Sequence, residues 1–356
     1  MSSDENSTAT DGFAKGPVTE WMRGLGEQVD GELQLTRIGL GQSNLTYLAE
    51  DDAARRWVLR RPPLGHRLAS AHDVIREAGI LQSLADTDVP VPRIVGITEN
   101  PAVTDAPLVA MEFVDGLAVD RMSVAETLTP ERRRAIGMSM PSMLSRIHAV
   151  NLEEHGLSGL ASHKPYAARQ LKRWAGQWEQ SKTRELPALD SLTRRLTAAI
   201  PEQTETSLVH GDFHLRNVLV TRDDQQLGAD ACGEVVATLD WELSTLGEPL
   251  ADIGSMLAYW PEAGEDYSGD LTATALEGFP TREEIAAEYL RLTGRDEAAL
   301  RYWHTLGLWK IAVIGEGVMR RAVDEPRNMA DAGTPTMERI DTLVDFATEI
   351  ADRARI

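Results

Sequence analysis

Two stretches of the chain decide the predicted fold: residues 207–220, SLVHGDFHLRNVLV, and residues 234–254, EVVATLDWELSTLGEPLADIG. Within them LVH, NVLV and VVATL have the composition of short β-strands, and the Gly- and Asp-rich residues between NVLV and VVATL are typical of a hairpin loop. In an antiparallel pair, the start of one strand lies beside the end of the other. We therefore expect Asn217 to lie next to Asp240, with Asp212 close by in the preceding loop.

These three side chains offer two carboxylates and one amide carbonyl at one edge of the predicted hairpin. Oxygen atoms of this kind are the ligands that Mg²⁺ prefers. Phosphoryl transfer needs such a set, in which one carboxylate orients the attacking hydroxyl while an Asp and an Asn hold the metal against the phosphates. The spacing D-x4-N, followed by the later Asp, therefore predicts a phosphotransferase site.

Two other interpretations of this segment stay open. Asp212 and Asn217 could cap turns while Asp240 ends a strand, which would be a purely structural role. Alternatively, His210, Asp212 and His214 alternate in a way that could ligate zinc in a metallohydrolase, although zinc sites need three or four protein ligands. We expect His210 to orient the loop through a backbone hydrogen bond instead.

The composition excludes several classes of protein. Of 356 residues, 42% are hydrophobic and 26% charged, which is enough apolar material for a sizeable core. The net charge of −20 repels phosphate backbones, so we expect no nucleic-acid partner. The single cysteine, Cys232, rules out an internal disulfide framework. No stretch reaches the ~18 apolar residues of a membrane span, and the polar N-terminus lacks the hydrophobic segment of a signal peptide. We expect a soluble, cytoplasmic protein without a membrane partner.

The order of the patterns predicts a mixed α+β protein with two lobes. Residues 1–15 are small and polar, and we expect them to form a disordered tail. Residues 16–114 carry the strand-like runs LQLTRIG, NLTYLAE, WVLRRP, RIVGITE and PLVAMEFV around one helix near 74–84, which indicates a small β-rich lobe. Residues 115–356 predict a larger, mostly helical lobe, with amphipathic helices at roughly 130–149, 166–183, 187–200, 282–293, 297–321 and 335–353.

The motif HGDFHLRN followed by LDWELSTLGEPLADIG resembles the aminoglycoside phosphotransferase/choline kinase-like family, whose members are relatives of the eukaryotic protein kinases. Within it, the chain is most similar to the acyl-CoA dehydrogenase-associated phosphotransferases and their actinobacterial homologues, from about Gly31 onward. The resemblance implies a protein-kinase-like two-lobe fold, with ATP and Mg²⁺ as cofactors and a small-molecule hydroxyl as acceptor. It also implies that Asp212 is the catalytic base, that Asn217 and Asp240 bind Mg²⁺, and that Asp252 supports the loop.

A kinase of this type needs a turn near the N-terminus that covers the nucleotide phosphates. Residues Gly39, Gly41, Gln42, Ser43 and Asn44 fit this need, because glycines let backbone N–H groups approach phosphate and the polar side chains can donate hydrogen bonds. A G-x-G pair alone is a weak signal. It also differs from the dinucleotide-binding pattern, since Asn44 stands where the third glycine would be.

The next strand should carry a cation that pairs with a glutamate on the following helix. In WVLRR, the period of two places Val58 and Arg60 on one face. Glu77 lies on or beside the apolar stripe of the 74–84 helix, where a carboxylate is costly without a partner. Arg60 is the expected partner, with Arg61 as the fallback, and a surface arginine pair is the structural alternative.

The adenine ring should meet the backbone where the first lobe ends. Met111, Glu112, Phe113 and Val114 lie there, at the end of the PLVAMEFV run. A strand edge offers one N–H and one C=O to the base, and we expect Val58 and Met111 to supply apolar contacts.

The acceptor is less well defined by the sequence. Trp241, Trp260, Tyr302, Trp303, Trp309 and Glu316 are candidates for its pocket, although tryptophans at helical spacing are more often core residues. The acidic balance suits a polycationic aminoglycoside or simply solubility. By resemblance, the dehydrogenase-associated relatives act on hydroxylated acyl compounds, which would need a basic pocket. A catalytically silent nucleotide-binding module and a protein-serine kinase are further alternatives to a small-molecule kinase.

Overall fold

The computed structural model describes residues 9–10, 13–38, 44–63, 73–161, 165–222, 233–265, 273–324 and 335–356. The chain divides into two compact units. The first consists of residues 1–115 together with 237–242, and the second of residues 116–236 and 243–356. The segment 237–242 therefore belongs to the first unit although it comes late in the chain.

The first unit is built around a five-stranded antiparallel sheet. Its strands lie in the order β3 (Gln34–Ile38), β4 (Leu45–Glu50), β5 (Arg56–Arg61), β7 (Leu108–Glu112) and β6 (Ile94–Thr98). Each of them coincides with one of the strand-like runs in the sequence. Side chains of a strand alternate between the two faces of the sheet. The sheet therefore has two apolar faces, and each of them needs a cover.

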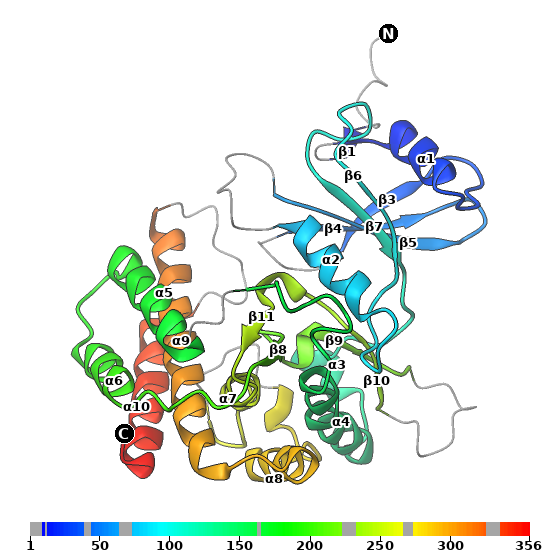
Figure 1. Ribbon diagram of the computed structural model, residues 1–356. Coiled ribbons are helices and arrows are strands. Elements are labelled where there is room, and N and C mark those ends of the chain that lie inside the picture. The colour runs from blue at the N-terminus through cyan, green and yellow to red at the C-terminus, as the bar shows by residue number, and fades with distance from the viewer. Residues whose placement is uncertain are drawn as a thin grey trace. The chain divides into compact units, whose positions relative to one another are not determined.

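Two helices cover the two faces, as Figure 1 shows. On one side Val18 and Met22 of α1 (Lys15–Gly24) share a core with Leu59 of the sheet. On the other side Ala78 of α2 (Val74–Leu84) packs with Met111. The helix α1 is absent from the sequence prediction. Just before it, β1 (Ala9–Thr10) pairs with β2 (Phe13–Ala14), within the stretch that was predicted to be a tail.

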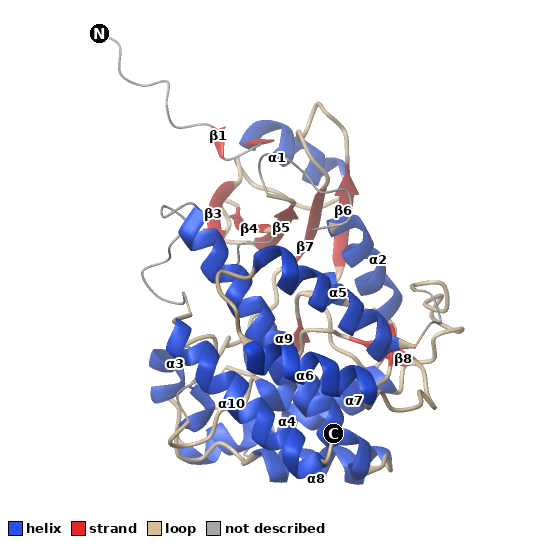
Figure 2. Ribbon diagram, turned by 90° about the vertical axis from the view of Figure 1, so that its left-hand side faces the viewer, coloured by secondary structure: helices blue, strands red, loops and turns tan. Residues whose placement is uncertain are grey.

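The second unit consists mostly of helices (Figure 2). They are α3 (Met122–Glu126), α4 (Pro130–His148), α5 (Tyr166–Ser181), α6 (Pro187–Ala198), α7 (Leu250–Ala258), α8 (Arg282–Thr293), α9 (Glu297–Asp324) and α10 (Met337–Ala354). Six match the predicted ranges within a few residues, whereas α3 and α7 were not predicted. The helix α7 has only nine residues and all of them are buried, so no exposed face sets it apart as a surface helix. No helix in the described ranges is long and apolar enough to cross a membrane.

Short strands frame the loop that carries the predicted catalytic residues. In the second unit β8 (Ser207–Val209) pairs antiparallel with β11 (Thr245–Gly247). The strand β9 (Val218–Val220) pairs with β10 (Val235–Thr238), whose first two residues belong to this unit. Residues 210–217 connect β8 to β9 and end in a short 3-10 turn. We call this connection the catalytic loop.

Candidate active site

The catalytic loop brings Asp212 and Asn217 into direct contact. The Asn217 Nδ2 atom donates hydrogen bonds to the backbone oxygen of Asp212 at 2.8 Å and to its carboxylate Oδ2 at 3.2 Å. Because the amide nitrogen is used in this way, the amide oxygen of Asn217 is the atom left to act as a ligand. The structure thus joins the two loop residues that the sequence singled out.

Positive groups surround the Asp212 carboxylate. The Nε2 atom of His214 lies 3.4 Å from its Oδ2 atom. Lys310, on α9, donates a hydrogen bond from Nζ to the backbone oxygen of Gly211 at 2.9 Å. Burial alone would raise the pKa of Asp212, but the attraction and hydrogen bonding of His214, together with the charge of Lys310, outweigh it and hold that pKa well below its usual range. Asp212 is therefore ionised at neutral pH.

Asp252 of α7 holds the backbone of the loop in place through hydrogen bonds. Its carboxylate, which is almost fully buried, accepts hydrogen bonds from the backbone N–H of His210 at 2.6 Å and of Gly211 at 2.9 Å. Gly211 has a φ of +83°, and a Cβ there would lie 2.7 Å from the backbone oxygen of Leu243, so only glycine fits. The Nδ1 atom of His210 accepts from the backbone N–H of Asp212 at 3.3 Å, which is the orienting role expected for His210.

The first unit holds a separate cluster of charged side chains around Arg60 of β5. The Arg60 guanidinium lies 3.0 Å from Glu77 of α2 and donates to Asp240 at 2.6 Å. Glu242 lies 3.7 Å away, and the other Glu77 oxygen accepts from the backbone N–H of Trp241 at 3.1 Å. Alternation in β5 and the helical stripe of α2 therefore place Arg60 and Glu77 together, as the sequence predicts.

Two features of this cluster are energetically costly without a further role. Burial raises the pKa of Glu77 to about 7, even though Arg60 opposes the shift. Asp240 has a φ of +65°, in the left-handed region that non-glycine residues seldom occupy. Such strain is concentrated at functional sites. Both features mark the cluster as a candidate for binding a charged ligand.

The turn predicted to cover the nucleotide phosphates is described only in part. Gly39, Gly41, Gln42 and Ser43 lie outside the described residues. Asn44 is buried and donates to Glu242 at 2.9 Å. Thus only the last residue of the predicted phosphate-covering turn can be placed, and it faces the Arg60 cluster.

The residues predicted to meet adenine lie on and just after β7 and on the neighbouring strand β5. Val58 and Met111 are cross-strand partners on the α2 side of the sheet. At the end of β7, the Glu112 carboxylate lies 3.6 Å from Arg93, and the Phe113 ring stacks beneath the Arg56 guanidinium at 4.1 Å. The partly buried Val114 follows. Arg61, the fallback for Arg60, is buried away from this cluster and pairs with Asp105 at 2.7 Å.

The zinc alternative gains no support from the structure. Among the residues that the structure describes, no group of three or more His, Cys, Asp or Glu side chains is arranged to hold a metal ion. The His214 ring instead packs on Tyr259 with their centroids 4.7 Å apart. A magnesium ion needs only one or two carboxylates when it also binds phosphates, so the same observation does not argue against Mg²⁺.

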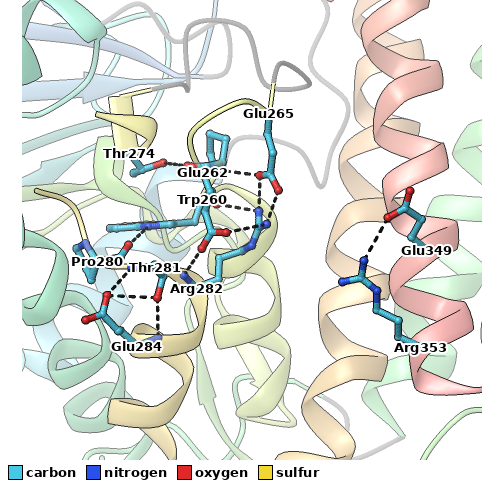
Figure 3. Close-up of polar contacts among 11 residues, drawn as sticks. Trp260, Glu262, Glu265, Thr274, Pro280, Thr281, Arg282, Glu284, Glu349 and Arg353 are labelled. Carbon is cyan, nitrogen blue, oxygen red and sulfur yellow. Dashed lines mark hydrogen bonds and ion pairs between the residues drawn. The ribbon is translucent and has the colours of Figure 1, made fainter. Parts of the chain in front are cut away.

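Most aromatic candidates for the acceptor pocket are parts of the core. Trp309 donates from Nε1 to Thr193, and Tyr302 donates to the backbone oxygen of Leu196. Trp260 donates to the backbone oxygen of Pro280, as Figure 3 shows. The remaining candidates are also held by the protein: Trp241 donates to the backbone oxygen of Thr238, and Glu316 binds Thr183 and Arg184. Of the candidates, Trp303 and Trp309 line a small cavity beside Gly211, together with Tyr166, Trp174 and Lys310.

A larger cavity of about 810 Å³ lies elsewhere in the second unit, between α8, α9 and α10. Figure 3 shows part of its wall, where Arg282 binds Glu262 and Glu265, and Arg353 lies near Glu349 across the gap. None of the catalytic-loop residues lines it. The volume of this cavity is therefore no reason to consider it the candidate active site.

Comparison with known proteins is consistent with this geometry. Residues 34–303 match the model of the phosphotransferase enzyme family. The chain belongs to this family. This family member is 34% identical over 341 residues to the mouse acyl-CoA dehydrogenase family member 10, a match that covers 93% of the chain and 31% of the mouse protein. The chain thus spans about a third of the length of that relative.

Solved structures of phosphotransferases show the same fold. A candidate aminoglycoside phosphotransferase from Ralstonia eutropha is 30% identical, with a TM-score of 0.75 and coverage of 95% of this chain and 99% of the other. The amicoumacin kinase hAmiN, determined with AMP-PNP and Ca²⁺, is 15% identical with a TM-score of 0.57, and the match covers 90% and 88% of the two chains. The predicted protein-kinase-like α+β fold is confirmed by these likenesses.

Three residues of interest were missed by the sequence analysis. Glu242, beside Arg60, lies two residues after Asp240 within the quoted motif, but nothing in its surroundings predicts its orientation. Lys310 interrupts the apolar run LGLWKIAVI, a signal for a buried cation that could have been used. Tyr289 contacts His148 through its hydroxyl, and no spacing rule connects positions so far apart.

Proposed function

We propose that the protein is an ATP-dependent phosphotransferase that moves the γ-phosphate of MgATP to a hydroxyl group of a small molecule. The observation that supports it best is the ionised Asp212, held by Asn217 within the HGDFHLRN loop of a phosphotransferase-family chain. Family membership supplies the reaction class. The contacts within the loop keep the Asp212 carboxylate negatively charged, as a residue that orients a hydroxyl group needs to be.

The proposed nucleotide side uses the Arg60 cluster. Arg60 steadies the α- and β-phosphates, Glu77 holds Arg60, and residues 39–44 cover the phosphates. We propose Asp240 and Asn217 as the protein ligands of Mg²⁺, because they offer a carboxylate and a free amide oxygen, the hard ligands that Mg²⁺ takes beside phosphates. Bound Mg²⁺ would neutralise charge that develops on the transferred phosphoryl group.

The proposed role of Asp212 follows from its low pKa. A carboxylate that binds a proton so weakly cannot remove one from a free alcohol early in the reaction. We therefore assign Asp212 to orienting the acceptor hydroxyl and to taking its proton late, as the new P–O bond forms. Asn217 keeps the Asp212 carboxylate in this orientation, and Asp252 keeps the loop backbone in place.

Lys310 restricts the class of acceptor. Its side-chain nitrogen donates to the Gly211 backbone beside the cavity lined by Tyr166 and Trp174. Burial lowers the pKa of Lys310, whereas the negative charge of Asp212 opposes this shift and favours the ammonium form. A cationic group of a substrate next to the reacting hydroxyl would be repelled there. We propose a neutral or anionic hydroxyl compound, such as a hydroxyacyl compound, rather than an aminoglycoside or a choline-like amine.

The proposed function is tested by measuring ATP consumption with aminoglycosides, choline-like amines, sugars and hydroxyacyl compounds. We expect turnover with compounds of the last two classes. A protein that binds MgATP but consumes none with any class would instead be the catalytically silent nucleotide-binding module. Turnover that is best with a polycationic aminoglycoside would contradict the acceptor class alone.

The substitution Lys310→Met tests the role of the lysine. It keeps the length of the side chain and removes its charge, so the KM for the acceptor should rise about tenfold, the equivalent of one charge-assisted hydrogen bond. The KM for ATP should stay unchanged. Lys172→Met, at an exposed lysine of α5, is the matched control and should leave both constants as they are. An unchanged acceptor KM in Lys310→Met would refute this role.

A further inference from the structure

Behind the catalytic loop, the Asp252 carboxylate has a third partner besides the two backbone N–H groups that it fixes. The Nε2 atom of His148, at the end of α4, lies 3.3 Å from Asp252 Oδ2. His148 is buried, and its ring meets the ring of Tyr289 edge to face. These two residues connect the loop to the outside of the second unit.

The direction of the hydrogen bonds along this connection can be derived from its two ends. Arg295 NH1 lies 3.1 Å from the Tyr289 hydroxyl, and an arginine can only donate. At the other end the Asp252 carboxylate can only accept, so His148 donates to it from Nε2, and its Nδ1 is left to accept the Tyr289 proton at 2.7 Å. With Nδ1 as acceptor, the ring proton of His148 is on Nε2, where it can be donated to Asp252.

The charges agree with this assignment. Burial lowers the pKa of His148, although Asp252 opposes the shift, so the ring is neutral and can accept at Nδ1. At the outer end Arg295 binds both oxygens of the Glu205 carboxylate. The Glu205 side chain is 43% exposed and that of Arg295 14%. The connection thus runs from a surface ion pair to the buried carboxylate of Asp252.

We propose that Glu205, Arg295, Tyr289, His148 and Asp252 form a positioning relay for the catalytic loop. In this relay Tyr289 supports the tautomer of His148 that donates to Asp252, because its hydroxyl gives the Nδ1 acceptor a buried donor. Without that hydroxyl, Nδ1 is a buried acceptor left without a donor, so the Nε2–H tautomer loses part of its advantage. The hydrogen bond to Asp252 then weakens, and the hold of Asp252 on the N–H groups of His210 and Gly211 loosens. The proposal rests on the proposed function only for its effect on turnover.

The test uses Tyr289→Phe, which removes the hydroxyl and leaves the ring. We expect kcat to fall about tenfold and the KM for ATP to stay within twofold, because the relay ends at the His210 and Gly211 backbone and not at a residue proposed to bind the nucleotide. His148→Gln keeps one donor for Asp252 and one acceptor for Tyr289, so it should retain more turnover than His148→Leu. Thr305→Val removes another buried hydroxyl of this unit, which donates to the backbone oxygen of Arg301; it is the matched control and should leave kcat unchanged.

Two further readouts do not depend on turnover. Nitrogen-15 NMR of the imidazoles, assigned with His148→Gln, should show the Nε2–H tautomer of His148 in the wild type and a mixture in Tyr289→Phe. Hydrogen exchange at the His210 and Gly211 amides should be faster in the variant. An Nδ1–H tautomer in the wild type, or a tautomer and exchange rates unchanged by the substitution, would overturn the relay. Absence of turnover in the wild type, with the expected spectra, would count against the proposed function and not against the relay.

Discussion

Replacing Asp212 with asparagine is expected to reduce the rate of phosphate transfer by about 10³-fold, while the affinity for MgATP changes by no more than about twofold. Loss of a positioned general base typically costs 10²–10⁴-fold. Asparagine has the same shape, so it can still accept a hydrogen bond through its oxygen. It cannot carry the negative charge that His214 and Lys310 stabilise, nor take the proton of the acceptor.

The measurement is the turnover of ATP with the best acceptor, together with a calorimetric titration of MgATP. Asp345→Asn, at an exposed carboxylate of α10, is the matched control and should leave both values unchanged. A fully active Asp212→Asn variant would refute the base assignment. A variant that fails to bind MgATP would show that Asp212 acts in nucleotide binding instead.

The second large effect is expected from Arg60→Met, which removes the cation between the Glu77 and Asp240 carboxylates. Breaking one side of a buried ion pair costs about 3–5 kcal/mol, because a charge is left without its partner. We expect the free energy of unfolding of the first unit to fall by about 3 kcal/mol, and the binding of MgATP to be lost. Arg37→Met, at an exposed arginine of β3, is the control.

The pH dependence of this loss has a definite sign. In the folded protein the pKa of Glu77 is about 7, against an ordinary value of 4.5. The folded state therefore holds a proton that the unfolded state releases, so this group stabilises the fold at low pH and its contribution is lost as the pH rises through 7. Without Arg60 the pKa should rise further, and the stability of Arg60→Met should decrease more steeply with pH.

Denaturant unfolding between pH 5 and 8 measures both effects. The double variant Arg60→Met with Glu77→Gln removes the unpaired carboxylate, so we expect it to regain part of the lost stability and to show a weaker pH dependence. Equal stability of Arg60→Met and the wild type across this pH range would show that the ion pair of Arg60 and Glu77 does not stabilise the fold.

Local sequence patterns were sufficient to predict contacts that depend on one face of a strand or helix, or on a short loop. The alternation of WVLRR placed Arg60 on the α2 side of the sheet, and the stripe of α2 placed Glu77 opposite it. The five-residue spacing placed Asp212 close to Asn217 in the predicted loop, and in the structure a short 3-10 turn brings the two side chains into contact. These contacts depend on neighbours in sequence or on a simple period.

Contacts that depend on packing between distant elements could not be predicted. The helix α7 is short and buried on all sides, so its polar residues do not mark an exposed face, and Asp252 within it could be assigned only by resemblance. Lys310 reaches the loop from α9, and Tyr289 reaches His148 from α8. Nothing in the spacing of such residues indicates that they meet, since the packing of helices decides it.

The use of MgATP is tested most directly by thermal unfolding with ATP, with and without Mg²⁺, for the wild type and Asp240→Ala. The account predicts that ATP raises the melting temperature of the wild type only when Mg²⁺ is present, by an amount that grows with ligand concentration, and that Asp240→Ala largely loses this shift. No shift in the wild type, or a full shift in Asp240→Ala, would contradict it.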